Sequence, residues 1–495
     1  MPVQMLIIPV VLPILSGALI PVFRFKKDAA REAWMLIWLL INLALIFALA
    51  LNRPEDYVIC LAPVPGLEIA LHLDGPAVVF ACQLALFWLL GALYAFEYMR
   101  REKKKNGFYA WFMIACGVAL GVAFSANLFT LYVFYVMLTL ATLPLLMYTS
   151  DLRATHAGKK YLLYSITGAA CVFIAIMLIT NITGSDLFLY GGMFRSLETI
   201  PEKAAAILPG AFLLAFFGFG VNALVWPLHG WLPTACAAPT PVTALLHAAA
   251  VPMAGAFGIM RVIYYIIGTD TLSSNVYGTK LLGGPWAQQV AIIFVLITIV
   301  YGSVMAVKEQ HLKRRLAYCA IGSLSGSLLG FLLMTPQGLR AGRMHLLFHG
   351  IIIIGLFFAA GALLCHHKIE YISRVRGCGR KMPVLFTCFT ISALALIGVP
   401  LFCGFVSKYE LSLAAIGSGN LLASVGVGAL ILSAFLLAVA LMGVIIPAFV
   451  PGRDFDHRSI ARVKDPGWRM KVSLLIPAAV VIFFGLFASP LKALL

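Results

Sequence analysis

Long apolar runs, each ended by charged residues, glycine or proline, follow one another along nearly the whole chain. A helix that crosses a bilayer needs about 20 predominantly apolar residues, and these runs have that length. They predict the following spans, numbered 1 to 14 in chain order: 3–23, 33–51, 74–96, 108–125, 127–148, 160–180, 207–227, 241–266, 287–306, 316–335, 344–365, 384–416, 421–449 and 472–491. We therefore expect an all-α polytopic membrane protein with about 14 transmembrane helices and short loops.

The composition agrees with this pattern and leaves little room for aqueous chemistry. Of the 495 residues, 62% are hydrophobic and 11% are charged, whereas soluble proteins carry roughly 25% charged residues. The ten cysteines form no Cys-x-x-Cys pair and mostly lie in apolar runs, which favours small buried hydrophobes over iron–sulfur ligands. We also find no Gly-rich phosphate loop and no nucleophile–base pair. The sequence thus predicts no catalytic site, metal or cofactor of its own.

The strongly basic charge, +17 from 36 Lys and Arg against 19 Asp and Glu, first suggests a nucleic-acid partner. The placement of these residues argues against it, because most lie in the short loops after odd-numbered spans. An excess of Lys and Arg marks cytoplasmic loops. We expect these loops in the cytoplasm and both termini outside a bacterial or archaeal cell (inner) membrane. The basic clusters would contact lipid headgroups, and we expect no nucleic-acid partner.

Few ionisable residues fall inside the apolar runs, where a charge costs at least ~2.5–3.5 kcal/mol. They are His247 in span 8, His345 and His349 in span 11, and Lys408 and Glu410 in span 12. The two span-11 histidines stand at i and i+4 and share one helix face, and histidine titrates near physiological pH, which suits a proton relay. As metal ligands they lack a third ligand nearby; two buried, hydrogen-bonded core histidines are the structural alternative. Glu410 stands at i+2 from Lys408 and points to a different face, so we expect no contact between them.

Helix-breaking residues interrupt the spans at particular places. Those in spans 7, 8 and 12 are Pro227, Pro233, Pro239, Pro400 and Gly404, so we expect spans 7 and 12 to be broken, span 12 at Gly398–Pro400 and again at Gly404. Non-helical backbone at membrane depth is tolerated only where protein or a wet cavity satisfies it. If spans 4–8 and 9–13 are inverted five-helix repeats, spans 7 and 12 match, and broken helices at matching positions indicate an ion pathway near the midplane.

This division predicts four parts. They are an N-terminal region with helices 1–3 (1–107), a first five-helix repeat (108–266), a second, inverted repeat (287–449), and a cytoplasmic basic loop followed by helix 14 (450–495).

One stretch of the chain resembles a known family. The run Gly220–Ala235 (GVNALVWPLHGWLPTA), continued by Ala238–Ala248 (APTPVTALLHA) and Arg261, is similar to the signature of antiporter-like subunits. These occur in respiratory complex I, in Mrp-type cation/proton antiporters and in membrane-bound hydrogenase or formate hydrogenlyase complexes. Further matches are Asn127–Phe129, Leu138–Thr142, Leu312–Tyr318, His345, His349, Gly398–Pro400 and Gly404–Lys408.

The resemblance implies a fourteen-helix subunit in which each inverted repeat provides half of a proton or sodium path. In the family, a span-5 glutamate pairs with a lysine in broken span 7, and a span-8 lysine passes the proton toward span 12. Here those three positions fall on Val136, Asn222 and Met253, and Ile353 takes a span-11 position that is often lysine. Loss of the glutamate and its lysine together is physically consistent, because one stranded charge costs ~3–5 kcal/mol. We therefore expect a degenerate first repeat.

The second repeat keeps His345, His349 and Lys408, and three hypotheses stay open. The chain is an ion-translocating membrane subunit of a multi-subunit redox or Mrp-type complex, with electron transfer in partner chains. Alternatively, it is a structural subunit that has lost pumping and bridges or seals its neighbours. A third hypothesis is a stand-alone secondary transporter, which the scarcity of charge at the midplane disfavours. The expected partners are other membrane subunits, lipid, and protons or sodium ions.

Overall fold

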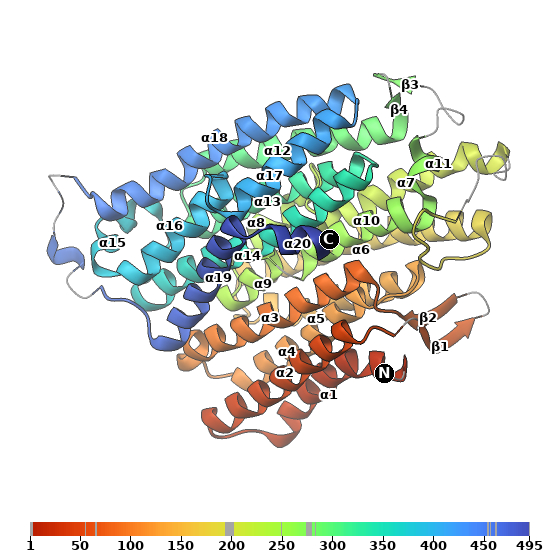
Figure 1. Ribbon diagram of the computed structural model, residues 1–495. Coiled ribbons are helices and arrows are strands. Elements are labelled where there is room, and N and C mark those ends of the chain that lie inside the picture. The colour runs from red at the N-terminus through yellow and green to blue at the C-terminus, as the bar shows by residue number, and fades with distance from the viewer. Residues whose placement is uncertain are drawn as a thin grey trace.

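A bundle of long helices dominates the computed structural model (Figure 1). Backbone is described for residues 3–54, 56–64, 67–193, 202–248, 250–273, 280–282, 284–452, 455, 457–460 and 463–494. Side chains are described for the same residues except 63, 64, 202–205, 246–248, 273, 457, 459, 490, 493 and 494.

The helices follow one another with short connections. In the first part they are η1 (Val3–Ile7), α1 (Ile8–Phe23), α2 (Asp28–Leu51), α3 (Gly75–Tyr98), η2 (Met99–Arg101), α4 (Lys105–Ala123), α5 (Leu128–Leu146) and α6 (Leu152–Thr183). The middle part has α7 (Glu202–Asn222), η4 (Leu228–Trp231), α8 (Leu232–Ala235), α9 (Thr240–Ala248), α10 (Val251–Arg261), the π-helix η5 (Val262–Ile267) and α11 (Thr269–Ser273). The last part has α12 (Trp286–Lys308), α13 (Leu312–Leu332), α14 (Pro336–His367), η7 (Ile372–Val375), α15 (Cys378–Lys381), α16 (Pro383–Ile397), α17 (Cys403–Gly417), α18 (Leu421–Phe449), η8 (His457–Ile460), α19 (Trp468–Leu486) and α20 (Ser489–Leu494).

The predicted membrane fold is confirmed. Within the described residues, 11 helices are long and apolar enough to cross a membrane. Predicted spans 7, 8 and 12 are each divided into shorter helices. The apolar helices of 10–17 residues in these spans are, in the same order, Ala206–Asn222, Val251–Ile267 and Pro383–Ile397. The number of crossings and the inverted repeats stay predictions.

The breaks lie close to, but not always at, the predicted residues. Span 12 is interrupted between α16 and α17, where Pro400 lies, but Gly404 is in the first turn of α17. The second interruption expected there is wrong. A Cβ at Gly404 would lie 1.8 Å from the carbonyl oxygen of Ala395, so this glycine allows a close approach of α16 and α17 rather than a break.

Spans 7 and 8 divide further than predicted. After α7 ends, Pro227 lies in the linker, Pro233 in the first turn of α8, and Pro239 directly before α9. Span 8, a single apolar run in the sequence that contains the helix-breaking Pro252, is split into α9 and α10. Pro252 occupies the first turn of α10, where its missing N–H costs no intrahelical bond but where it prevents the helix from continuing backward.

A β-hairpin departs from the all-α expectation. Strands β1 (Val58–Val64) and β2 (Leu67–Leu71) pair antiparallel between α2 and α3, and a short pair, β3 (Lys280–Leu281) and β4 (Gly284–Pro285), precedes α12. Leu71 also bridges to Ser125 after α4. The hairpin and the N-terminal η1 lie at the same end of the bundle, opposite α15 (Figure 1).

Helices α13 and α14 form the centre of the bundle. Their apolar windows are 94% and 100% buried, whereas that of α2 is 28% buried. Gly342 of α14 lies so close to α13 that a Cβ there would meet the Phe331 ring at 2.7 Å, the close approach that small residues permit in membranes. The helix that carries the two histidines is thus the most enclosed one.

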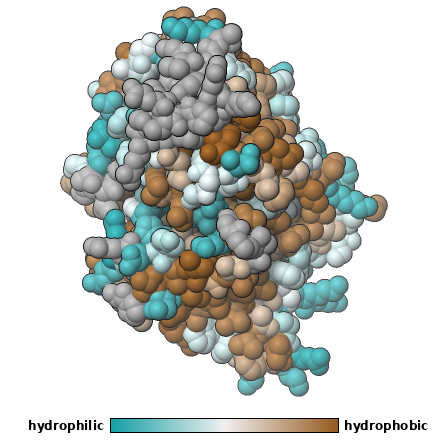
Figure 2. Space-filling model, turned by 90° about the vertical axis from the view of Figure 1, so that its right-hand side faces the viewer, coloured by the Kyte–Doolittle hydropathy of each residue, from teal (hydrophilic) through white to brown (hydrophobic). Residues whose placement is uncertain are grey.

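The end of the molecule near the hairpin has a mixed surface. Figure 2 shows hydrophilic and hydrophobic patches side by side there. Such mixing is typical of helix ends and loops that emerge from the apolar layer.

A buried ion pair fastens α3 to α10. The Arg261 guanidinium donates two hydrogen bonds to the Asp74 carboxylate, one of 2.7 Å from Nη2 to Oδ1 and a second, short one from Nη1. The Arg261 side chain is 2% exposed and that of Asp74 20%. Three rings surround the guanidinium at 4.4–4.8 Å from their centroids, in the favourable cation–π range: Phe188, Phe257 and Tyr265.

Replacing Arg261 with leucine leaves the Asp74 carboxylate without its partner. We expect the free energy of unfolding to fall by about 3–5 kcal/mol, measured as an earlier thermal unfolding midpoint of the purified chain in detergent. Arg340→Leu, at an exposed arginine of α14, is the matched control and should leave the midpoint unchanged. Equal midpoints for the two variants would contradict a stabilising role for the pair.

Candidate functional site

The side chain of Lys408 lies at the break between α16 and α17. The backbone turns at Gly398 and Leu401, whose φ angles are +95° and +78°. A helix leaves its last carbonyls without intrahelical partners. The Lys408 ammonium donates to two of these, the carbonyl oxygens of Leu396 at 2.7 Å and Ile397 at 2.9 Å. The charged side chain therefore caps the interrupted helix.

The positive charge of the Lys408 ammonium is thus stabilised by uncharged carbonyl oxygens. The carbonyl end of α16 is the negative end of its dipole and stabilises positive charge. Among the described residues, no carboxylate lies within salt-bridge distance of Lys408. Loss of a proton from Lys408 would thus leave no acid stranded. Gly398 gives the stem its room, because a Cβ there would lie 3.0 Å from Lys408 Cδ.

Ser323 of α13 contacts both span-11 histidines through different atoms, and His345 is also hydrogen-bonded to α17. His345 Nδ1 lies 2.8 Å from Ser407 Oγ, and its Nε2 lies 3.0 Å from the Ser323 carbonyl oxygen. His349 Nδ1 lies 3.2 Å from Ser323 Oγ. Both histidines are at most 3% exposed. The expected shared face thus faces α13 and α17, away from the surface of the bundle.

Each histidine can bind and release a proton, but the Ser323 carbonyl oxygen only accepts a hydrogen bond, so a proton passes between the two rings only through an intervening water molecule. The Ser323 carbonyl can only accept, so Nε2 of His345 holds a hydrogen and Nδ1 accepts from Ser407 when the ring is neutral. When the ring is charged, Nδ1 donates instead, and the Ser407 hydroxyl can turn to the Gly404 carbonyl oxygen, 3.2 Å away. His349 Nε2 is buried and has no partner among the described residues. That open position is where an incoming or outgoing proton would bind.

The remaining predicted inward residues lie elsewhere. His247 is in α9, but its side chain lies outside the described residues. Glu410 makes no salt bridge with Lys408, as expected from their spacing; its carboxylate instead pairs with Lys492 of α20 at 2.5 Å. No sequence pattern points to that partner, because Lys492 follows the last predicted span. Ser323 carries no signal either, since serine is common in apolar helices.

The break of span 7 uses neutral donors where span 12 uses a lysine. Near the end of α7, the Tyr135 hydroxyl donates to the Gly218 carbonyl at 3.1 Å, and the Trp231 indole N–H donates to the Val221 carbonyl at 2.9 Å. Asn222, at the position of the family's lysine, is fully buried, and neither amide atom has a partner among the described residues. The Phe219 and Gly220 carbonyls accept from the backbone N–H groups of Ala223 and Val225, so the described bonds at the end of α7 involve no charged group.

Helices α5 and α6 carry several buried polar side chains. Val136 on α5 is partly buried and offers only methyl groups. The Thr142 and Tyr161 hydroxyls bond to each other at 3.0 Å, and Ser165 Oγ is buried without a partner in the described part of the chain. Buried polar atoms without protein partners commonly bind water. This part of the molecule therefore contains buried polar groups.

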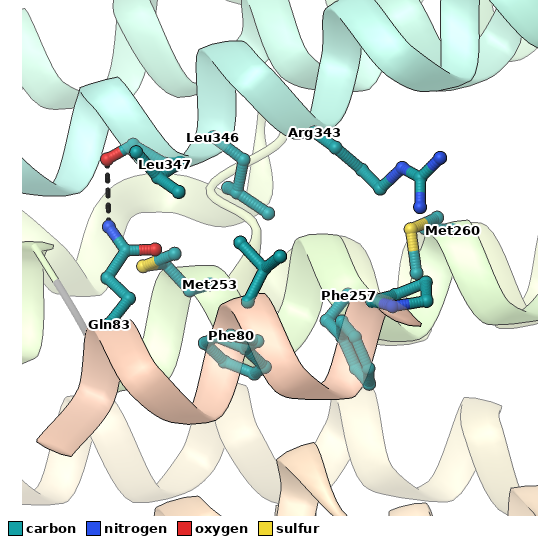
Figure 3. Close-up of a pocket in the computed structure, with 10 residues that line it drawn as sticks. Phe80, Gln83, Met253, Phe257, Met260, Arg343, Leu346 and Leu347 are labelled. Carbon is teal, nitrogen blue, oxygen red and sulfur yellow. Dashed lines mark hydrogen bonds between the residues drawn. The ribbon is translucent and has the colours of Figure 1, made fainter. Parts of the chain in front are cut away.

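The connection between the halves is apolar at the position of the family's span-8 lysine. Met253 is 1% exposed and lines a cavity of about 30 Å³ between α3, α10 and α14 (Figure 3). That volume holds about one water molecule. Gln83 spans the cavity edge by donating to the Leu347 carbonyl at 2.8 Å, while Arg343 extends toward Met260 at the other end (Figure 3).

Ile353 continues this apolar character along α14, with 0% exposure. Neither position holds a charged relay group, and a Met thioether or an Ile side chain carries no exchangeable proton. As a metal centre the region offers little: within the described residues, no three His, Cys, Asp or Glu side chains come together.

Comparison with known proteins agrees with the fold and the motifs. Residues 125–436 match the family model described as NADH:quinone oxidoreductase/Mrp antiporter, TM. The chain is 29% identical over 503 aligned residues to NADH-quinone oxidoreductase subunit N of Desulforudis audaxviator, covering 98% of this chain and 96% of the relative. It is also 29% identical to a probable K(+)/H(+) antiporter subunit of Rhizobium meliloti, over 79% of this chain, and spans 38% of that longer protein.

A solved structure shows the same fold. A chain in the Mrp complex of Dietzia sp. DQ12-45-1b superimposes with a TM-score of 0.84 at 21% sequence identity, covering 100% of this chain and 96% of that one. The matched family region includes the breaks of spans 7 and 12, both histidines and Lys408. The chain therefore belongs to the NADH:quinone oxidoreductase/Mrp antiporter transmembrane family.

Proposed function

We propose that this chain is an ion-translocating membrane subunit of a multi-subunit complex and that its second half, 287–449, carries the ion. The observation that carries the proposal is the Lys408 ammonium, held by helix-end carbonyls with no carboxylate partner among the described residues. Intramembrane ionisable groups mark ion pathways. The nearby imidazoles of His345 and His349 and the hydroxyls of Ser407 and Ser323 supply groups between which water passes a proton.

The first half, 108–266, has lost this capacity in our proposal. Asn222 and Met253 replace the relay lysines, and two carbonyls at the end of α7 are satisfied by neutral donors. The buried apolar side chains of Met253 and Ile353 then separate the halves. The two parts are proposed to be inverted repeats, preceded by the N-terminal region 1–107 and followed by the basic loop and last helix, 450–495.

The orientation follows from the charge pattern. We place the basic loops in the cytoplasm and both termini outside, in a bacterial or archaeal cell membrane. Relatives are subunits of NADH-quinone oxidoreductase and of a cation/proton antiporter, so the partners are other membrane subunits of such an assembly, and the ion is a proton or sodium.

A structural subunit is the second candidate. The one-water cavity at Met253 and the buried Ile353 favour it, because a pathway interrupted by dry side chains does not conduct. In this case, Lys408 only provides hydrogen bonds to the carbonyls at the end of α16, and the chain bridges or seals neighbouring subunits.

The variant Lys408→Ala separates the two candidates. We expect it to abolish ion movement while the complex still assembles, because Lys408 is the only charged group that caps α16 in the described part of the chain. The assay measures ion uptake by inside-out membrane vesicles that carry the assembled complex. The reaction of the complex drives the uptake. A pH-sensitive dye reports protons, and radioactive sodium reports sodium ions. Lys308→Ala, at an exposed lysine of α12, is the control. Undiminished uptake in Lys408→Ala would support the structural candidate instead.

The serine in the relay offers a milder test. Ser323→Ala removes the hydroxyl partner of His349 but keeps the carbonyl that binds His345. We expect slower ion uptake in the same vesicles with unchanged assembly. Ser325→Ala is matched, because Ser325 is also buried on α13 and its hydroxyl donates within its own helix, to the Ile321 carbonyl. A relay through Ser323 is wrong if the two variants transport equally fast.

The proposed inactivity of the first half is tested at Asn222. Asn222→Leu removes two amide atoms that have no described partner, each costing about 1–3 kcal/mol when buried, so we expect ion uptake to persist and thermal stability to be kept or raised. Asn127→Leu is the contrasting control, because that buried amide bonds to the Glu68 carbonyl and the Thr130 N–H, both at 2.7 Å, and its loss destabilises. Abolished uptake in Asn222→Leu would show that the first half still conducts.

A further inference from the structure

Glu410 and Lys492 form an ion pair that joins the second piece of broken span 12 to the C-terminal helix. Glu410 Oε1 lies 2.5 Å from Lys492 Nζ, with side chains 17% and 38% exposed. Glu410 lies in the middle of α17, and Lys492 lies in α20, after α19 has ended at Leu486. A carboxylate inside an apolar run is costly unless it is paired, and Glu410 finds its partner in Lys492.

The pair lies at nearly the same level of α17 as Lys408. Residues advance about 1.5 Å each along a helix, so Glu410 is only about 3 Å farther toward Gly417 than Lys408. Positions i and i+2 differ by about 200° around the axis, and Ser407 lies between the two flanks. Helix α17 thus presents Lys408 to the α16 carbonyls, Ser407 to His345 and Glu410 to α20.

The C-terminal segment has a fixed position from which to hold Glu410. Gly485 of α19 packs against the break itself, since a Cβ there would lie 2.1 Å from the Leu401 carbonyl oxygen. The Phe484 ring lies 5.8 Å from that of Phe348, next to His349 in sequence. At its other end α19 is tied to α2 by Arg469–Glu32 at 2.7 Å.

We propose that Glu410 is the acceptor to which Lys408 passes a proton on the way out of the second half, and that Lys492 is the positioning residue that holds this carboxylate in place. This inference rests on the proposed function. In this transfer, an N–H bond of the Lys408 ammonium breaks, water carries the proton around Ser407, and an O–H bond forms on Glu410. Release of that proton outward restores the carboxylate, which pairs again with Lys492.

The double variant Glu410→Gln with Lys492→Gln tests the acceptor without stranding a charge. We expect the complex to assemble with normal thermal stability but to lose ion uptake in the vesicle assay. The matched control neutralises the other ion pair of the same segment, Glu32→Gln with Arg469→Gln, and should transport like the wild type. Wild-type uptake in the Glu410/Lys492 double variant would overturn the proposal.

Exchanging the two charges of the pair distinguishes a proton acceptor from an ion pair that only stabilises the contact between α17 and α20. Glu410→Lys with Lys492→Glu restores an ion pair but moves the carboxylate from α17 to α20, so we expect restored stability without ion uptake. Lys492→Arg keeps the positive charge and should retain uptake. Restored uptake in the exchanged variant would mean that the pair only braces the helices. Loss of uptake in Lys408→Ala with normal uptake in the Glu410/Lys492 double variant would preserve the proposed function and reject only the acceptor.

Discussion

A helix that is interrupted inside a bilayer leaves carbonyl oxygens that must find hydrogen-bond donors, and this requirement organises the whole site. At the end of α16 the donor is an ammonium, that of Lys408. At the end of α7 the donors are the backbone N–H groups of Ala223 and Val225 and the indole N–H of Trp231. Both solutions keep the backbone satisfied, so both helices can remain broken. Only the first provides a group that gains and loses charge.

This difference lets each helix stay broken without the same chemistry. In our proposal, Val136 and Asn222 stand where an acid and a base were lost together, which avoids an uncompensated buried charge. Trp231 supplies a neutral donor to the Val221 carbonyl, and the Asn222 amide has no partner among the described residues. In the second half the lysine itself supplies the donors for the last carbonyls of α16, so its removal would leave them unsatisfied.

The sequence predicted the large features well because they depend on local pattern. The apolar run 421–449 coincides with α18, and the spacing of His345 and His349 placed both on one inward face. Tertiary partners were not predictable from such patterns. Nothing near Glu410 in the sequence points to Lys492, which the fold brings to α17 from the last helix, and Ser323 becomes a relay partner only because α13 packs against α14.

Other differences between sequence and structure have local physical causes. The hairpin β1–β2 lies in a segment too short and too mixed to show alternation. Span 8 is one apolar run in the sequence, although Pro252 starts a new helix within it. The error at Gly404 is of a different kind, because a glycine that permits helices to approach has the same sequence signal as one that ends a helix. Glycine serves both purposes in membrane helices, and only packing distinguishes them.

The central claim is that ions move through the second half and not through the first. A structure of the assembled complex in lipid nanodiscs, at a resolution that reveals ordered water, tests it most directly. The account predicts a water chain that connects His349 and Lys408 with a membrane surface, and dry packing around Met253 and Ile353. Dry packing around Lys408, or a continuous water chain that passes Asn222 and Met253, would contradict it.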